Sequence, residues 1–390
     1  MNPTEFQPTA FSAVPVGFKL PTLIDLTDPD LSQRLQARLD NKTKPVGSLG
    51  RLEALAVRLG LILGTLRPEL HHPQMVVFAA DHGLAAHGVS AYPSDVTWQM
   101  VSNFLAGGAA VSVLARQHGL ALTVVDCGVS HDFPAHPQLQ ARKVAPGTQD
   151  MLQAMAMTPR QCAQALQHGM DLVRELPGNV LLLGEMGIGN TSAASLLLAQ
   201  LTGRDLADCT GAGTGLTEAG LQAKLQVLRG VQQRHQMDLD AARASGLLKP
   251  EAWGGTGAGV VARHEAAALF TLASLGGLEV ATMVGAVLQA AFERKVILVD
   301  GFIASAAVMA AAALRPQVLQ RCVFAHRSSE HAHGLLLEHL KAEPLLDWGL
   351  RLGEGSGAAL AWPLVASASR ILIEMASFED AGVSRQASGA

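Results

Sequence analysis

Short apolar runs separated by amphipathic stretches recur along the chain, a pattern typical of a parallel sheet covered by helices. Each run has the length of a buried strand, and we predict strands at residues 75–80, 120–125, 180–183, 295–299 and 323–325. Apolar positions at helical spacing predict helices at residues 32–39, 51–60, 96–105, 159–176, 218–229, 266–275, 280–292, 305–314 and 360–375, and one more between Gly108 and His118. The alternation predicts an α/β fold.

Two stretches lack this periodicity. Four prolines in residues 1–26 favour an extended arm over a helix. Residues 134–152 are expected to be irregular, and Thr158 before Pro159 predicts an N-cap for the helix that follows.

The stretch that most strongly indicates a function runs from residue 180 to residue 195, as a strand, a glycine turn and a helix of small residues. Its glycines allow the backbone to approach a ligand closely, and the polar residues after them are expected to cap the helix. Helix N-termini bind phosphate through unpaired N–H groups, so a phosphorylated small molecule is the natural occupant. An ordinary capped turn is the alternative. The residues concerned are Gly184, Gly187, Gly189, Asn190, Thr191 and Ser192.

Two glutamates are candidates for chemistry. Glu185 would repel a phosphate bound at this turn, so we expect it to face a cationic or proton-donating part of the ligand. Glu354 stands between Gly353 and Gly355 with apolar residues nearby, and such surroundings raise a carboxyl pKa toward the range useful for a base near neutrality. A helix-capping glutamate is the competing interpretation of Glu354.

Other glycine-rich and polar positions extend this candidate site. A second glycine loop at residues 211–216 follows the first by one helix, as two walls of one site would, and the next helix carries Lys224. A third glycine turn is expected at residues 254–259. Asp81 and His82 follow the strand at 75–80, where α/β sheets bind ligands, and could form an acid/base pair or ligate a metal.

Two further sets of polar residues allow a functional and a structural interpretation. Lys42 and Lys44, in the loop at residues 41–50, could reach toward an anion, and a solvated turn between two helices is the alternative. Three histidines raise the possibility of zinc, but their spacing fits no common zinc motif, and no second cluster near Asp81 supports a metal; they are His326, His331 and His333. We therefore predict no metal site.

Composition narrows the class of protein. With 390 residues, 49% of them hydrophobic and 4% aromatic, the chain can bury a large aliphatic core. A net charge of −4 without a run of Lys and Arg argues against a nucleic-acid partner. The N-terminus lacks the pattern of a signal peptide, and the apolar residues 302–314 are too few to cross a bilayer, so we predict a soluble protein without a membrane partner. Four widely spaced cysteines are expected to be free thiols in a reducing cytoplasm: Cys127, Cys162, Cys209 and Cys322.

Taken together, these motifs resemble the nicotinate-nucleotide–dimethylbenzimidazole phosphoribosyltransferases, which make α-ribazole phosphate for the lower ligand of cobalamin. The resemblance extends from about residue 43 to residue 383, and it is specific because five motifs occur in one order, at residues 43–53, 80–83, 184–191, 299–303 and 351–355. Residues 325–333 depart from the pattern: they read Ala-His-Arg-Ser-Ser-Glu-His-Ala-His, where the family is closer to Ser-His-Gln-Ser-Ala-Glu-Pro-Gly-His. In this stretch Ser328 and Glu330 match.

The resemblance implies a reaction in which a benzimidazole nitrogen displaces nicotinate from C1′ of nicotinate mononucleotide, with inversion and without a metal or redox cofactor. Glu354 matches the general base of the family, and Glu185 matches a second acidic residue of the site. The expected phosphate ligands are Gly187, Gly189, Asn190 and Thr191, supported by Lys224, Ser328 and Arg351. The other expected substrate contacts are Ser90, Gln99, Met186 and Leu352 around 5,6-dimethylbenzimidazole, and Asp300 in one of the matching motifs.

The resemblance also implies an architecture and an assembly. A large Rossmann-like domain with a parallel sheet is expected beside a small helical domain built from both chain ends. In this sequence we place the N-terminal arm and first helices at residues 1–70, the large α/β domain at 71–340, and the C-terminal helices with the catalytic loop at 341–390. A homodimer is expected.

Overall fold

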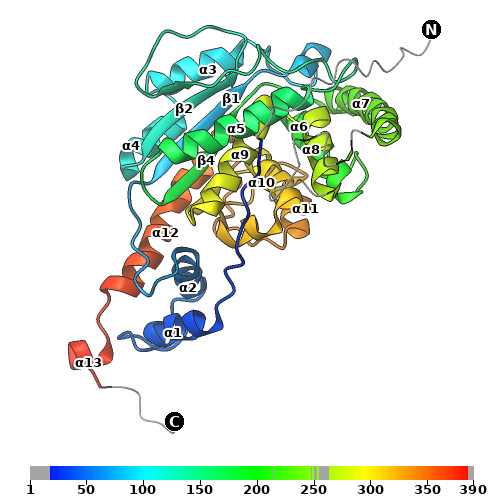
Figure 1. Ribbon diagram of the computed structural model, residues 1–390. Helices are drawn as coiled ribbons and strands as arrows, with labels where there is room; N and C mark the ends of the chain where they lie inside the picture. Colours follow the sequence, from blue (N-terminus) through cyan, green and yellow to red (C-terminus); the bar gives the residue numbers. More distant parts are fainter. Residues whose placement is uncertain (1–17, 214, 247, 250–252, 254–262, 385–390) are drawn as a thin grey trace.

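A six-stranded parallel sheet forms the centre of the computed structural model, which describes residues 18–213, 215–246, 248–249, 253 and 263–384 (Figure 1). The strand order is β3-β2-β1-β4-β5-β6, which is the doubly wound order with its topological switch between β1 and β4. Ligands of such sheets bind outside the carboxyl ends of the strands at this switch. The strands are β1 (Gln74–Ala80), β2 (Ala121–Gly128), β3 (Leu139–Ala141), β4 (Val180–Met186), β5 (Val296–Val299) and β6 (Cys322–Phe324).

Helices cover both faces of the sheet, and successive residues of the central strand β1 point to opposite faces. Val76 and Phe78 belong to one buried cluster, and Met75 and Val77 belong to the other. The first cluster draws on α5 (Pro159–Glu175), α6 (Asn190–Thr202), α7 (Glu218–Ser245), α8 (Arg263–Leu275), α9 (Leu278–Phe292) and α10 (Phe302–Leu314). The second draws on α1 (Pro29–Asp40), α2 (Arg51–Leu63), α3 (Val96–Leu105), α4 (Ala110–His118) and α12 (Ser356–Glu374).

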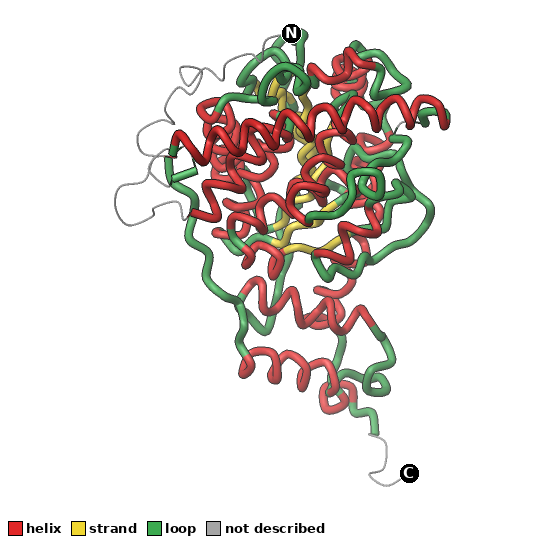
Figure 2. Tube along the Cα trace, turned by 90° about the vertical axis from the view of Figure 1, so that its right-hand side faces the viewer, coloured by secondary structure: helices red, strands yellow, loops and turns green. Residues whose placement is uncertain are grey.

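Helices from the N-terminal and C-terminal regions of the chain form a group that projects from the α/β body (Figures 1 and 2). α1 packs on α2, and α2 packs on α12. A short bridge joins Lys42, after α1, to Ser377, before α13 (Phe378–Ala381). α12 also contacts β4 and β5, so it connects this group of helices to the carboxyl edge of the sheet.

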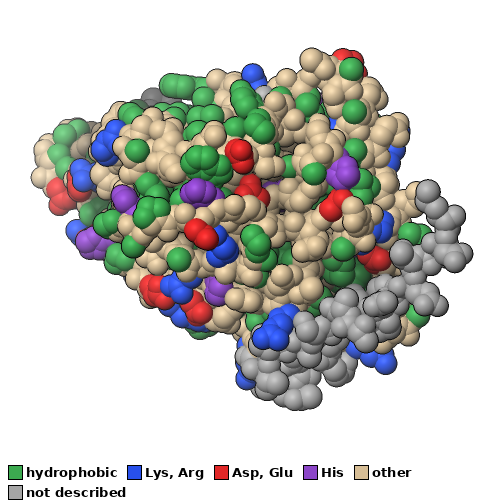
Figure 3. All heavy atoms as spheres, turned by 90° about the horizontal axis from the view of Figure 1, so that it is seen from above, with side chains coloured by type: hydrophobic (Ala, Val, Ile, Leu, Met, Phe, Trp, Pro, Cys, Tyr) green, Lys and Arg blue, Asp and Glu red, His purple; other side chains and the backbone are tan. Residues whose placement is uncertain are grey.

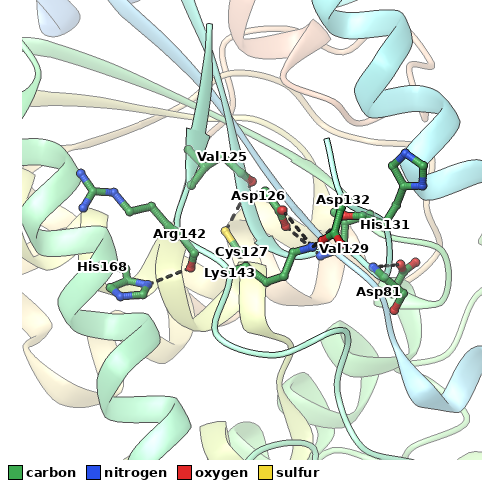
Figure 4. A network of polar contacts seen from close by, with 11 residues as sticks. Asp81, Val125, Asp126, Cys127, Val129, His131, Asp132, Arg142, Lys143 and His168 are labelled. Carbon is green, nitrogen blue, oxygen red and sulfur yellow. Dashed lines mark hydrogen bonds and ion pairs between the residues drawn. The ribbon is translucent and has the colours of Figure 1, made fainter. Parts of the chain in front are cut away.

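The loop after β2 is fastened to the carboxyl edge of the sheet by a network of polar contacts (Figure 4). The Asp81 carboxylate accepts the backbone N–H of Ser130 at 2.8 Å, and Asp126 accepts that of Val129 at 2.9 Å. Lys143 donates to the His131 carbonyl oxygen at 2.7 Å and lies 3.4 Å from the Asp126 carboxylate. The polar residues after β1 and β2 therefore organise loops at this edge.

Most elements agree with the prediction from the sequence, and the differences have physical causes. All five predicted strands form, but β3 lies in the stretch predicted to be irregular, because a three-residue edge strand carries too little periodicity to be seen. α7 continues to Ser245, sixteen residues beyond the predicted end, through a polar stretch with few apolar positions. Thr158 caps α5 as predicted. Two short 3₁₀ helices, α11 and α13 were not predicted: Gly83–His87, Pro316–Arg321, His333–His339 and Phe378–Ala381.

Several predictions fall wholly or partly outside the described residues. The predicted third glycine turn at 254–259 lies outside them, as do residues 1–17 of the predicted arm and Thr214 of the second glycine loop. The four cysteines lie within them, and all four are buried free thiols, as predicted.

Two stretches, Val96–His118 and Ser356–Glu374, are long and apolar enough to cross a membrane by composition. Both pack within the fold, since Val101, Val111, Ala361 and Val365 belong to the buried cluster on one face of the sheet. On the face of the molecule seen from above, the basic and acidic side chains of the described residues are scattered among apolar ones and form no broad basic patch (Figure 3).

Candidate active site

The first glycine turn lies at the topological switch, directly after β4, where the sheet order predicts a ligand site. Gly187 packs against the neighbouring strand end so closely that a β-carbon there would meet the Ala80 carbonyl oxygen at 2.6 Å and the His82 ring at 3.3 Å. The backbone N–H of Ile188 donates to the buried Thr97 hydroxyl of α3 at 3.1 Å. The turn is therefore held from beneath by β1 and from one side by α3.

The polar residues after this turn do not cap α6, which corrects the prediction from the sequence. Gly189 is the N-cap residue, with φ of 96°, and no side chain accepts a hydrogen bond from the first turn. Asn190 instead donates to the Glu185 carboxylate at 2.5 Å, and the Thr191 hydroxyl accepts a hydrogen bond from Lys224 at 3.0 Å. The N–H groups of Asn190 and Ser192 donate to the carbonyl oxygens of Gly187 and Gly189, at 3.1 and 3.0 Å, so anion binding at this helix start rests on the remaining N–H groups and on the helix dipole.

Glu185 connects β4 to two other elements of the site. It is buried, it accepts the Asn190 hydrogen bond, and it lies against the Glu354 turn, where a β-carbon on Gly353 would meet its Oε1 at 2.5 Å. Burial is the main cause that raises the pKa of Glu185 to about 8; the Asn190 hydrogen bond opposes this rise, and the charges of Asp300 and Glu279 add to it. Near neutrality the carboxyl group therefore holds a proton.

Glu354 occupies a turn that few residues other than glycine adopt. Its φ is 63°, and the flanking Gly353 and Gly355 have φ of 79° and 85°, so three successive residues are left-handed. A non-glycine residue in this region carries a conformational cost of order 1–3 kcal/mol, and such strain clusters at functional sites. Gly355 is the N-cap of α12 and the Glu354 side chain does not cap that helix, so the capping interpretation is wrong.

The carboxyl group of Glu354 has the properties expected of a base. Burial raises the pKa of Glu354 to about 7, and the negative charge of Asp300 acts in the same direction. The side chain is 7% exposed, which leaves it within reach of a ligand. A group with this pKa is divided between its two protonation states near pH 7, which is where general-base catalysis is most effective.

Asp300 follows β5 and is buried beside the two glutamates. Its carboxylate accepts two main-chain N–H groups at the start of α12, from Gly355 at 3.1 Å and from Ala358 at 2.9 Å. His326, from the loop after β6, lies 3.5 Å from the same carboxylate. The strong polar contacts of Asp300 are thus with protein groups, although the family resemblance places it among the substrate contacts.

Lys224 joins the two glycine loops, as expected for two walls of one site. Its ammonium group is buried, donates to the Thr191 hydroxyl and donates to the Gly211 carbonyl oxygen at 3.1 Å. Burial lowers the pKa of Lys224 to about 8, against the influence of the Glu330 charge. The Glu330 carboxylate in turn accepts the backbone N–H of Gly213 at 3.3 Å.

A buried ion pair lies beneath the first glycine turn. His82 Nε2 is 2.6 Å from Oε1 of Glu279, in the first turn of α9, and both side chains are inaccessible to solvent. Burial lowers the pKa of His82, but the charge and hydrogen bond of Glu279 outweigh burial, so the net pKa is raised. The sequence singled out His82 and Asp81 as possible partners of each other, whereas each has a different partner: Glu279 for the imidazole and the Ser130 N–H for the carboxylate.

The remaining predicted residues are distributed around this centre. Met186 is buried at the end of β4, Ser328 is buried near Gly301, and Leu352 and Arg351 lie exposed just before the Glu354 turn. Ser90 is half-buried before α3, and Gln99 is exposed on α3. Their roles in binding stay predictions.

The lysines and histidines that the sequence suggested as possible ligand-binding residues mostly form contacts with other protein groups. Lys42 donates to the Met375 carbonyl oxygen and Lys44 lies 2.8 Å from the Glu53 carboxylate, both inside the helical group from the chain ends. His333 contacts the Ser305 hydroxyl at 3.0 Å and accepts the Ser328 N–H at 2.9 Å, whereas His331 is exposed.

Three residues that support the site carry no signal of that role in the sequence. Thr97 is a buried position in a helix with no distinctive motif, and Glu279 lies in the first turn of an apolar helix. Glu330 stands out only because it matches the family pattern. Their contacts in the folded chain show their places: Thr97 accepts the Ile188 N–H, Glu279 pairs with His82, and Glu330 accepts the Gly213 N–H.

The chain is similar to known proteins over nearly its whole length. A family model described as phosphoribosyltransferase matches residues 24–383. The nicotinate-nucleotide–dimethylbenzimidazole phosphoribosyltransferase of Variovorax paradoxus is 61% identical over 369 residues, 94% of this chain and 97% of its own, and that of Dechloromonas aromatica is 53% identical, covering 93% and 98%. The crystal structure of the enzyme of that name from Thermus thermophilus superposes with a TM-score of 0.80 at 38% identity, covering 92% of this chain and all of its own.

Proposed function

Since the chain belongs to the nicotinate-nucleotide–dimethylbenzimidazole phosphoribosyltransferase family, we propose that it transfers the phosphoribosyl group of nicotinate mononucleotide to 5,6-dimethylbenzimidazole. The products are α-ribazole 5′-phosphate and nicotinate, and the ribotide serves the nucleotide loop of cobalamin. The observation that carries the proposal is the Glu354 turn: a buried carboxyl group with its pKa raised to about 7, at the edge of the sheet where the phosphate-binding turn also lies.

The chemistry asks little of the protein beyond placement and a proton acceptor. A lone pair on one ring nitrogen of the benzimidazole forms the new bond to C1′ from the α face. The bond from C1′ to the pyridinium nitrogen breaks, and its electron pair leaves with nicotinate. The other ring nitrogen then gives its proton to Glu354, so the charges balance. Holding the two reactants in contact supplies much of the acceleration.

Glu185 has a complementary electrostatic role in this scheme. Its carboxyl group is buried and its pKa is raised to about 8, so it is largely protonated while the site holds no cation. A pyridinium ring bound beside it favours the ionised form, because an opposite charge lowers a carboxyl pKa. The resulting carboxylate stabilises cationic character on the ribosyl group as the bond to nicotinate breaks.

The phosphate subsite combines helix geometry with a buried cation. The start of α6 has no side-chain cap and contributes the positive end of its helix dipole, and Lys224 stands between Thr191 and the second glycine loop. An incoming phosphate gains the attraction of the Lys224 ammonium group in a poorly solvated place, where charges interact strongly. We assign Gly187, Gly189, Asn190 and Thr191 to this subsite, with Ser328 and Arg351 as further polar supports.

The benzimidazole is assigned to the apolar side of the Glu354 turn. Met186 and Leu352 offer apolar contacts there, and Ser90 and Gln99 are the polar candidates. We also propose that the enzyme is a cytoplasmic homodimer that needs no metal or redox cofactor.

Product analysis tests the proposed function. Incubation with nicotinate mononucleotide alone should release little nicotinate, whereas added 5,6-dimethylbenzimidazole should release nicotinate in equal amount to a new ribotide. A hydrolase using Glu185 and Glu354 as paired carboxylates would release nicotinate regardless of the added base. A nucleotide-binding module without catalysis would bind the ribotide and form no product.

A further inference from the structure

The start of α12 lacks a capping side chain of its own, and a residue from the sheet replaces it. Gly355 is the N-cap, and no side chain of the helix accepts its first N–H groups. Asp300, fifty-five residues earlier in the chain, accepts the N–H groups of Gly355 and Ala358 with its two carboxylate oxygens. A carboxylate at a helix N-terminus is favoured by both the unpaired N–H groups and the helix dipole.

The first of these hydrogen bonds fixes the peptide group that joins Glu354 to Gly355. The turn is confined from the other side by Glu185, because a β-carbon on Gly353 would meet the Glu185 Oε1 at 2.5 Å. Two acidic side chains, at the ends of β5 and β4, therefore contact the residues on either side of Glu354. This matters because Glu354 has φ of 63°, a conformation that its surroundings must maintain.

We propose that Asp300 is a positioning residue for the reaction: through Gly355 and Ala358 it holds the Glu354 turn in the conformation that presents the base. The inference rests on the proposed function, in which Glu354 accepts the proton. It assigns Asp300 to the placement of the base, whereas a direct role would have the carboxylate bind the substrate. With a 1% exposed side chain and both oxygens engaged by α12, the geometry favours the indirect role.

The same placement gives Asp300 an electrostatic influence on the base. The titratable groups around it are Glu354 on the turn, Glu185 at the end of β4, His326 after β6, and His333 in α11. Burial and then the charge of Asp300 raise the pKa of Glu354. Removal of this charge therefore lowers the pKa of Glu354, and a pH profile reports the change.

Asp300→Asn in the full-length enzyme tests the inference. The amide keeps the size but loses the charge and one acceptor, so it cannot accept both N–H groups. We expect turnover to fall roughly 10- to 100-fold, as for a reacting group displaced by about 1 Å, while the KM for nicotinate mononucleotide changes less than about threefold. The acidic limb of the turnover profile should move to lower pH.

A matched control is Asp126→Asn, which alters a buried carboxylate at the end of β2 that also accepts a backbone N–H but does not contact α12. Its acidic limb should stay in place. Asp300→Glu restores the charge, and should keep the limb near its wild-type position and recover part of the turnover lost in Asp300→Asn. If Asp300→Asn does not fold, Asp300→Glu becomes the test variant.

Three results would overturn the inference: an unchanged turnover in Asp300→Asn, a KM for nicotinate mononucleotide that rises as much as turnover falls, or acidic limbs that move equally in the Asp300→Asn and Asp126→Asn variants. A crystal structure of Asp300→Asn adds a readout that does not depend on activity. The Glu354 turn should there leave its left-handed conformation or become disordered. If the wild-type enzyme forms no ribotide at all, the proposed function fails, and the crystal structure still decides whether Asp300 holds the turn.

Discussion

Gly184 in β4 lies so close to the Glu354 turn that a β-carbon on Gly184 would meet the Glu354 carbonyl oxygen at 2.6 Å. Real β-carbons do not approach backbone oxygens this closely, so the side chain of any other residue displaces the turn from the strand. The turn therefore depends on glycine at a strand position where glycine is otherwise unfavourable. This contact places the proposed base directly over β4.

We expect Gly184→Ala to lower turnover by about 10²-fold, because a displacement near 1 Å of a reacting group has an effect of this size. Steady-state kinetics with both substrates should show the loss in turnover. Gly334→Ala in α11 is the control, since a β-carbon there would meet only a terminal nitrogen of Arg327 at 3.5 Å. If Gly184→Ala keeps wild-type turnover, the turn does not need this contact.

Lys224→Ala should weaken binding of nicotinate mononucleotide more than binding of 5,6-dimethylbenzimidazole. The physical reason is the loss of a buried ammonium group beside Thr191 and the first turn of α6. Calorimetric titrations of the wild type and the variant should include nicotinate riboside, which lacks the phosphate. An equal loss of affinity for the riboside and the mononucleotide would remove Lys224 from the phosphate subsite.

The sequence predicts the positions of the strands well, but it predicts contacts between distant residues poorly. Buried parallel strands leave long apolar runs, so the predicted bounds of β1, β4 and β5 lie within about three residues of the observed ones. α6 shows the limit: Asn190, Thr191 and Ser192 are good capping residues, yet Gly189 takes the N-cap position. Asn190 is drawn instead to Glu185, a tertiary contact that local propensity cannot contain.

In the candidate site, too, local features could be predicted from the sequence and long-range contacts could not. The glycines around Glu354 and the glycine turn after β4 indicated where the candidate site lies, because such residues mark backbone conformations that a local pattern can reveal. The roles of Asp300, Thr97 and Glu279 depend on which strands are neighbours. Local patterns carry no information about contacts that span fifty-five to nearly two hundred residues.

The raised carboxyl pKa values predict how stability changes with pH. In the unfolded chain Glu354 titrates near 4.5, whereas in the folded protein its pKa is about 7. The folded state thus holds the proton more tightly, so its stability relative to the unfolded state falls as pH rises from about 4.5 through 7. Glu354→Gln has no titrating carboxyl group at this position, so its stability does not fall with rising pH for this reason.

We therefore expect the difference in free energy of unfolding between Glu354→Gln and the wild type to depend on pH. Denaturant unfolding at pH 5 gives the reference value of this difference. At pH 8.5 the variant should have gained on the order of 1–3 kcal/mol over the wild type. Glu185→Gln should behave in the same way, with its change centred nearer pH 8. A difference between variant and wild type that does not depend on pH would contradict the burial of these carboxyl groups.

The central claim is that Glu354 accepts the proton from the incoming base, and the pH dependence of turnover tests it most directly. Wild-type turnover with saturating nicotinate mononucleotide and 5,6-dimethylbenzimidazole should rise through one apparent pKa as Glu354 loses its proton. Glu354→Gln should stay folded and bind both substrates, with turnover reduced roughly 10²–10⁴-fold and the acidic limb absent. A variant with near-normal turnover and the same acidic limb would contradict the claim and make Glu185 the leading candidate for the base.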